Sequence, residues 1–397
     1  MFKLDQSNLT FIAKTITGLE EVLAAELLKL GARDIEIMNR AVRFKGDLGT
    51  LYKTNLSLRT ALRILVPIAD VNATNENELY KSINILPWEE ILDPEDSLAI
   101  DTVLSTQLFN HSQYVSQKAK DAIVDRFRSK FNKRPDVDLD NPTVRIHLHI
   151  SNDNINIALD SSGDSLHKRG YREKTNKAPL NEVLAAGMVL LTGWDGNSNF
   201  IDLMCGSGTI VIEAAMLAAN IPPGYYRNDF GFMNWNKLLP FDSQLWNTIL
   251  DAAIDRISSK DLKLVGVELS GNVVKKAKEN VKFARVDDIV EIVKEDAREF
   301  IPPDGNGVVI VNPPYGERMD KDNIPQLYGE LGDAFKKHFS GYDCWMISSN
   351  FDALKNVGLR PSRKIKVFNG PLECRFMKYQ MYKGTKKIHK INLADKS

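Results

Sequence analysis

The stretch FIDLMCGSGTIVIEAA, residues 200–215, decides the fold. Its apolar start predicts a buried strand that ends near Asp202, and its second half predicts a helix. Gly206 and Gly208 stand in the turn between them, where glycine lets the backbone approach a ligand closely. The first N–H groups of the helix offer donors beside that turn. The pattern departs from the dinucleotide fingerprint, because a third glycine is missing and position 211 is Val.

Strands and helices keep alternating downstream of this stretch. The alternation predicts a parallel, doubly wound sheet. Two final strands, RKIKVFN (363–369) and RFMKYQMYK (375–383), have no helix between them, so we expect an antiparallel edge. Residues 221–246 read as an insertion between the first helix and the second strand.

The upstream part of the chain contains two further α/β units. The first seventy residues follow a β-α-β-β-α-β order, which is the ferredoxin-like arrangement. A second unit of helices and alternating strands extends to about residue 165. Because 397 residues exceed one ordinary core, we expect domains at 1–70, 71–165 and 166–397.

The composition excludes several classes of protein. Hydrophobic residues make up 43% and charged residues 26% of the chain, as in globular proteins, and the formal net charge is zero. A nucleic-acid partner therefore has to be held by local basic patches. No apolar run is long enough to span a membrane, and the three cysteines lack metal-ligand spacing. We expect a cytoplasmic protein with reduced thiols, no membrane segment and no metal.

Acidic residues stand where the next two strands of the predicted sheet end. Glu268 closes the strand LKLVGVEL, and Asp296 follows the third strand. The carboxyl ends of parallel strands meet at one edge of the sheet, where ligands bind. A carboxylate at the position of Glu268 suits two ribose hydroxyls, and Asp296 can face an adenine. Together with Asp202, these residues predict a bound nucleoside.

The candidate catalytic residues stand at the end of the fourth strand, in the stretch VVIVNPPYGER (308–318). Two prolines end a buried strand, since neither donates a ladder hydrogen bond. The Asn312 side-chain oxygen and the Pro313 carbonyl are two acceptors for an exocyclic amine, and they stabilise positive charge that develops on its nitrogen. Tyr315 offers a face on which a flipped base stacks. The motif therefore predicts transfer of an electrophilic methyl group to a base amine.

These motifs resemble those of the S-adenosylmethionine-dependent amino-methyltransferases. The N-terminal half, HKRGYREKTNKAPLNEVLAA at the junction and NGPLECRFMKYQMY near the end narrow the resemblance to the THUMP-domain RNA guanine-N2 methyltransferases. It implies ferredoxin-like and THUMP domains followed by a Rossmann-like class I methyltransferase sheet. It also implies S-adenosylmethionine as cofactor, and as partner 23S rRNA or a ribosome assembly intermediate. The alternatives are a tRNA enzyme, an adenine-N6 methyltransferase and a non-catalytic RNA-binding module.

The resemblance carries roles over to individual residues of this chain. Those expected at the reacting amine are Asn312, Pro313, Pro314 and Tyr315. Those expected at the cofactor are Asp202, Cys205, Gly206, Gly208, Glu268, Asp296, Ala297 and Asn312.

A basic stretch at the junction is a candidate for RNA contact. Residues 161–177 are polar and rich in turn residues, with cations placed around an aromatic side chain, as in a phosphate-lined path. A solvated linker is the alternative interpretation. The residues expected to contact RNA are Lys168, Arg169, Tyr171, Arg172 and Lys174.

Overall fold

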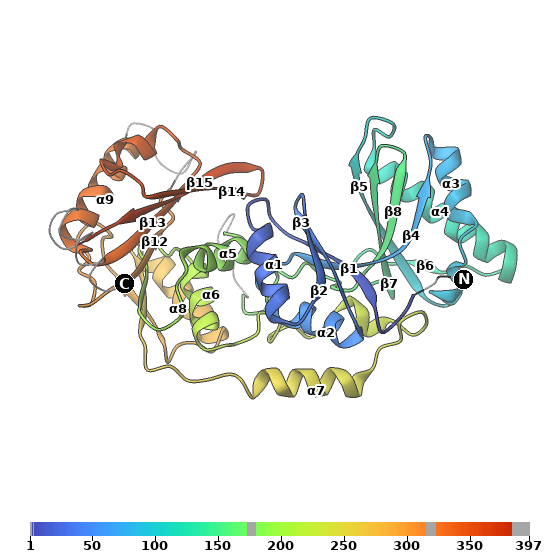
Figure 1. Cartoon of the computed structure of the whole chain (residues 1–397), viewed down its shortest axis with the longest axis horizontal. Coiled ribbons are helices and arrows are strands. Elements are labelled where there is room, and N and C mark those ends of the chain that lie inside the picture. Colours follow the sequence, from blue (N-terminus) through green and yellow to red (C-terminus); the bar gives the residue numbers. More distant parts are fainter. Residues whose placement is uncertain (1, 3, 173–179, 315–322, 383–397) are drawn as a thin grey trace. The chain divides into compact units, whose positions relative to one another are not determined.

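The computed structural model describes residue 2 and residues 4–172, 180–314 and 323–382 (Figure 1). Contacts within the chain divide it into two compact units. Unit 1 consists of Met1–Thr15, Leu23–Lys168 and Arg227–Ala252, and unit 2 consists of Ile16–Val22, Arg169–Tyr226 and Ala253–Ser397.

Unit 1 is built on an eight-stranded sheet with the order β2-β3-β1-β4-β8-β7-β5-β6. Its strands are β1 (Leu9–Lys14), β2 (Arg33–Met38), β3 (Ala41–Gly46), β4 (Arg63–Asn72), β5 (Ser97–Ser105), β6 (Asp136–Val137), β7 (Val144–Ser151) and β8 (Asn154–Asp160). Its helices are α1 (Glu20–Lys29, shared with unit 2), α2 (Leu48–Ser57), α3 (Glu76–Asn84), η1 (Trp88–Glu90) and α4 (Ser112–Phe131). The order β2-β3-β1-β4 confirms the predicted ferredoxin-like arrangement.

The two predicted N-terminal domains share this sheet. Strand β4 pairs with β1 on one side and with β8 on the other, antiparallel in both cases. It runs through residue 70, where the sequence predicts a domain boundary. The three domain ranges stay a prediction.

From Arg227 on, the insertion between α6 (Thr209–Ala218) and the second strand of the other sheet belongs to unit 1. It contains η2 (Gly231–Asn234) and the start of α7 (Ser243–Ile254), and most of α7 also belongs to unit 1. The Phe232 ring stacks on Tyr52 of α2 with the ring centroids 4.6 Å apart, and Trp246 meets the edge of Tyr52 at 6.0 Å. The Asp242 backbone N–H also donates to the Tyr52 hydroxyl at 2.9 Å. This aromatic cluster stabilises unit 1 with residues from distant parts of the chain.

Unit 2 is built on a seven-stranded sheet with the order β11-β10-β9-β12-β13-β15-β14. Its strands are β9 (Asn199–Asp202), β10 (Leu264–Glu268), β11 (Val290–Lys294), β12 (Gly307–Val311), β13 (Tyr342–Ser348), β14 (Arg363–Asn369) and β15 (Leu372–Gln380). Its helices are α5 (Glu182–Thr192), α6 (Thr209–Ala218), α8 (Gly271–Phe283), α9 (Ile324–His338) and η3 (Ala353–Val357). Strands β9 to β13 pair in parallel, while β15 is antiparallel to β13 and β14. The predicted antiparallel edge is confirmed.

Both faces of this sheet are buried. Residues from α5, α6 and α8 pack with Phe200, Leu264 and Ile310 on one face. Residues from α9 and η3 pack on the other, with the alternate strand residues Ile201 and Val309. Burial on both faces explains why the strands read as apolar runs. Strand β9 lies between β10 and β12, so the connections diverge there and leave a crevice at the strands' carboxyl ends.

Candidate active site

The glycine turn after β9 is fixed by backbone conformation and by Glu268. Gly206 and Gly208 have φ values of +55° and +84°, which other residues adopt only with strain. Glu268, at the end of β10, accepts a hydrogen bond from the Gly206 N–H at 3.1 Å and from the Ser270 N–H at 2.8 Å. Each carboxylate oxygen is thus held in place and keeps further capacity to accept from a ligand.

Asp202 carries a buried carboxyl group without a partner. The residue is fully buried at the end of β9, and neither side-chain oxygen makes a hydrogen bond among the described residues. Burial, with a smaller contribution from the charge of Glu268, raises the pKa of Asp202 to about 8. The Val211 N–H in the first turn of α6 lowers this pKa in part, but it is not placed to complete a regular hydrogen bond. Such a group is suited to a cationic ligand.

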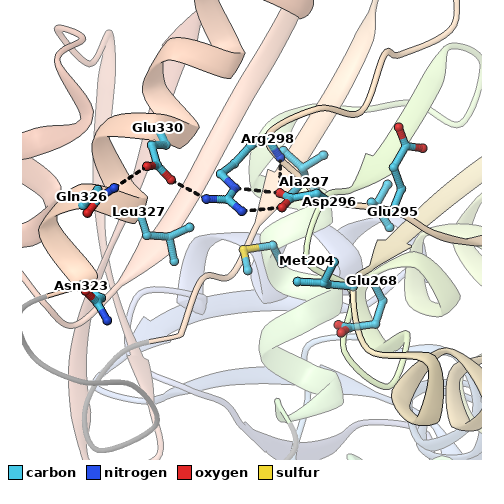
Figure 2. Close-up of a pocket in the computed structure, with 13 residues that line it drawn as sticks. Met204, Glu268, Glu295, Asp296, Ala297, Arg298, Asn323, Gln326, Leu327 and Glu330 are labelled. Atoms are coloured by element: carbon cyan, nitrogen blue, oxygen red, sulfur yellow. Dashed lines mark hydrogen bonds and ion pairs between the residues drawn. The ribbon is translucent and has the colours of Figure 1, made fainter.

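A pocket of about 370 Å³ opens at the carboxyl ends of these strands, within the size range of small-molecule sites. Figure 2 shows Glu268 on one side, Asp296 and Ala297 above Met204, and side chains of α9 opposite them. The lining residues are Leu203, Met204, Val267, Glu268, Leu269, Glu295, Asp296, Ala297, Arg298, Asn323, Gln326, Leu327 and Glu330. Three of the residues predicted to bind the cofactor, Glu268, Asp296 and Ala297, therefore share one pocket.

Asn312 presents a second unpaired acceptor. It follows β12 directly, and its buried Oδ1 has no hydrogen-bond partner among the described residues. Pro313 is buried and Pro314 half-buried. Tyr315 lies outside the described residues. A buried amide oxygen without a donor is costly, so this atom can accept a hydrogen bond from a ligand or from water.

Two residues of the basic junction stretch that the sequence predicts to contact RNA are buried. Arg169 and Tyr171 are 2% and 1% exposed, and both donate to the carboxylate of Glu213 on α6, at 3.2 and 3.1 Å from Oε1. The Arg172 guanidinium forms an ion pair with Glu182 at 2.9 Å and donates to Thr209.

Of the residues predicted to contact RNA, Lys168 is exposed, and it pairs with Asp164 at 3.0 Å. Lys174 lies outside the described residues. The assignment of this stretch to RNA contact stays a prediction.

Sequence reasoning missed the acidic partners of these cations. Glu213 stands alone among apolar residues in TIVIEAAMLA, the sequence of α6, and is fully buried. A single charge in an apolar helix signals a buried ion pair, because an unpaired buried charge is too costly. Arg298 and Glu330 were also missed, since nothing in their local sequence indicates that they meet.

No group of three or more potential metal ligands lies together in the described part of the chain. Among the described residues, no helix is long and apolar enough to cross a membrane.

The doubly wound sheet, the glycine turn after its first strand and the acid ending its second strand define a class I methyltransferase. A family model described as RMKL-like, methyltransferase domain matches residues 169–378. The RlmL ferredoxin-like domain matches residues 10–65, and the THUMP domain matches residues 73–160. The chain belongs to this RMKL-like methyltransferase family, which confirms the resemblance drawn from its motifs.

Individual relatives agree with that membership. The chain is 37% identical over 383 residues to the ribosomal RNA large subunit methyltransferase K/L of Syntrophotalea carbinolica, covering 94% of this chain and 53% of that one. It thus spans about half the length of that relative. It is 35% identical over 376 residues to a putative RNA methyltransferase of Synechocystis, covering 94% and 97%. A solved putative methyltransferase complexed with SAH superposes with a TM-score of 0.84 at 29% identity, covering 96% and 100%.

Proposed function

We propose that this protein transfers a methyl group from S-adenosylmethionine to the exocyclic N2 amine of guanine, in the 23S RNA of the large ribosomal subunit. The observation that carries the proposal is the unpaired, buried Oδ1 of Asn312, placed at the end of β12 beside β9 and followed by two prolines. The name of the Syntrophotalea relative supports the choice of ribosomal RNA.

The pocket and the glycine turn fit the cofactor. Glu268 accepts from the ribose hydroxyls, while Asp296 and the backbone of Ala297 face the adenine. Cys205, Gly206 and Gly208 form the turn against which the methionine part lies. The buried, unpaired carboxyl of Asp202 suits the ammonium group of that methionine part. When bound, the cofactor supplies an electrophilic methyl group on sulfur.

The NPPY motif holds the target amine. The two N–H groups of the guanine amine donate to the Asn312 side-chain oxygen and to the Pro313 carbonyl. The lone pair of the amine nitrogen is otherwise delocalised into the ring. The two acceptors would stabilise the charge that grows on this nitrogen as its bond to the methyl carbon forms and the bond between that carbon and sulfur breaks, with the thioether as leaving group. The excess proton then leaves to water. Pro314 keeps the acceptors rigid, and the Tyr315 ring stacks on the flipped base.

The N-terminal part presents the RNA. We retain the division into 1–70, 71–165 and 166–397, with RNA capture in the first two domains and methyl transfer in the last. The THUMP match supports this division of labour. The substrate is rRNA or a ribosome assembly intermediate in the cytoplasm, and exposed Lys168 contributes a phosphate contact near the junction.

The proposal is tested by product analysis. The full chain is incubated with S-adenosylmethionine and with 23S rRNA or bulk tRNA from a strain that lacks the gene, and the nucleosides are identified by mass spectrometry. We expect 2-methylguanosine in the rRNA sample alone. N6-methyladenosine or methylation of tRNA alone would contradict the proposal. So would the absence of methylation both from naked 23S rRNA and from ribosome assembly intermediates of the same strain.

We expect Glu268→Ala to weaken S-adenosylmethionine binding by about 1.5–3 kcal/mol, the range for a charge-assisted hydrogen bond. The substitution also frees the Gly206 N–H, so the turn loses part of its support. Isothermal titration calorimetry measures the change. Glu295→Ala removes a negative charge from the same pocket and serves as the control, with an expected change below about 0.5 kcal/mol. Equal effects of the two substitutions would place the ribose elsewhere.

Cofactor affinity should rise with pH below 8. The pKa of Asp202 is about 8 in the free protein, so its carboxyl is mostly protonated at pH 6 to 7. An ammonium group beside it lowers this pKa, so binding releases a proton and the association constant grows up to about tenfold per pH unit between pH 6 and 7.5. Titrations in buffers of different ionisation enthalpy count the protons. Asp202→Asn should remove this dependence of the affinity on pH. If the affinity of the unaltered protein does not change with pH, Asp202 does not bind the ammonium group of the cofactor.

A further inference from the structure

We propose that Arg298 is a positioning residue that makes the cofactor pocket selective for adenine over a deaminated base, by holding the Asp296 carboxylate toward the exocyclic amine. The inference rests on the proposed use of S-adenosylmethionine and adds the selectivity of the pocket to it.

Arg298 connects two sides of the pocket (Figure 2). Its backbone N–H and its Nε both donate to Oδ1 of Asp296 at 2.9 Å, and a terminal nitrogen donates to Oδ2. The other terminal nitrogen donates to Glu330 on α9 at 2.7 Å, and Gln326 one turn earlier donates to the second Glu330 oxygen at 2.8 Å. The Arg298 guanidinium group, a fork of N–H donors, therefore fixes the carboxylate of Asp296. This guanidinium group is in turn held by α9, a helix that lines the same pocket.

The held carboxylate can only accept hydrogen bonds. The donors from Arg298 lower the pKa of Asp296, so it remains ionised at neutral pH. An ionised carboxylate pairs with the amine of adenine, which donates. A deaminated base carries a carbonyl oxygen at that position, and two facing acceptors repel each other. Selectivity thus depends on the direction of the Asp296 carboxylate, which the hydrogen bonds from Arg298 fix.

The bridge contributes little to folding. The Arg298 side chain is 44% exposed and that of Glu330 34%, so solvent screens their attraction. Loss of Arg298 should therefore leave the protein folded and alter mainly the orientation of Asp296. A binding experiment on the variant accordingly reports on the pocket rather than on unfolding.

The test is calorimetry on the full chain with two probes, S-adenosylhomocysteine and its deaminated analogue S-inosylhomocysteine. The unaltered protein should prefer the adenine form by at least about 100-fold, because the analogue sets a carbonyl oxygen against the Asp296 carboxylate. Arg298→Gln should reduce this ratio to about tenfold or less. Arg298→Lys, which keeps the charge without the fork, should be intermediate.

Two further variants serve as comparisons for Arg298→Gln. Asp296→Asn can present an N–H donor to the deaminated base, so its preference should vanish or reverse. Lys336→Gln, which removes an exposed cation of α9 paired with Asp333, should leave the ratio unchanged. If Arg298→Gln weakens both probes equally, Arg298 has only a structural role and the inference is overturned. If the unaltered protein binds neither probe, the proposed cofactor itself is wrong, and the inference falls with it.

Discussion

Replacing Asn312 with alanine is expected to slow methyl transfer by about 10²–10³, while cofactor affinity changes little. The substitution removes a buried acceptor that has no partner in the described structure. Its hydrogen bond to the amine strengthens as positive charge develops on nitrogen, so the loss falls on the transition state more than on binding. Removing a comparable preorganised group from other active sites costs a similar factor.

Single-turnover methylation of 2-methylguanosine-deficient rRNA measures the rate, with cofactor affinity determined for each variant. Asn312→Asp keeps an acceptor oxygen at the same place and should retain more activity than Asn312→Ala. Tyr315→Phe keeps the stacking face and should be milder than Tyr315→Ala, which should also weaken capture of the base. An Asn312→Ala protein of near-normal rate would mean that the two prolines serve only as a turn after β12.

The catalytic sheet could be predicted because its signals are local. Each strand is a short apolar run, and the residues that matter stand at its carboxyl end, so alternation with helices places Glu268 and Asp296 at one edge. The structure places both in one pocket. The antiparallel edge was equally readable, since the two last strands follow each other without a helix.

Contacts between distant segments could not be predicted. The Phe232 ring stacks on Tyr52 although the two residues are 180 positions apart. The sequence around either residue gives no indication of the other. The bridge from Arg298 to Glu330 depends on how close α9 lies to the segment after β11, and no periodicity in the sequence determines that. For the same reason the insertion was recognised by its length, but its place in unit 1 was not.

The junction stretch shows how composition misleads about exposure. Interleaved cations and an aromatic ring indicate a surface path for phosphates, and such a stretch is indistinguishable from one whose cations have buried partners. Glu213 and Glu182 supply those partners in the structure, through α6 and α5. The two interpretations make opposite predictions for the removal of Glu213.

Glu213→Ala is expected to destabilise the methyltransferase unit by about 3–5 kcal/mol. The substitution leaves the Arg169 guanidinium buried without this carboxylate and takes the acceptor from the Tyr171 hydroxyl. Breaking one side of a buried ion pair costs this much because the remaining charge keeps its desolvation penalty. Denaturant unfolding measures the change, followed by tryptophan fluorescence and checked for a separate transition of each unit.

Asp164→Ala provides the matched control, since it breaks the exposed pair with Lys168 four residues away and should cost less than about 0.5 kcal/mol. Glu213→Gln keeps an acceptor oxygen for Tyr171 but loses the charge. Its loss of stability should therefore fall between those of Glu213→Ala and Asp164→Ala. If Glu213→Ala instead unfolds normally and loses RNA affinity, the cations of this stretch turn outward to the substrate. A large loss of stability would mean that Arg169 and Tyr171 hold the junction against α6 through Glu213.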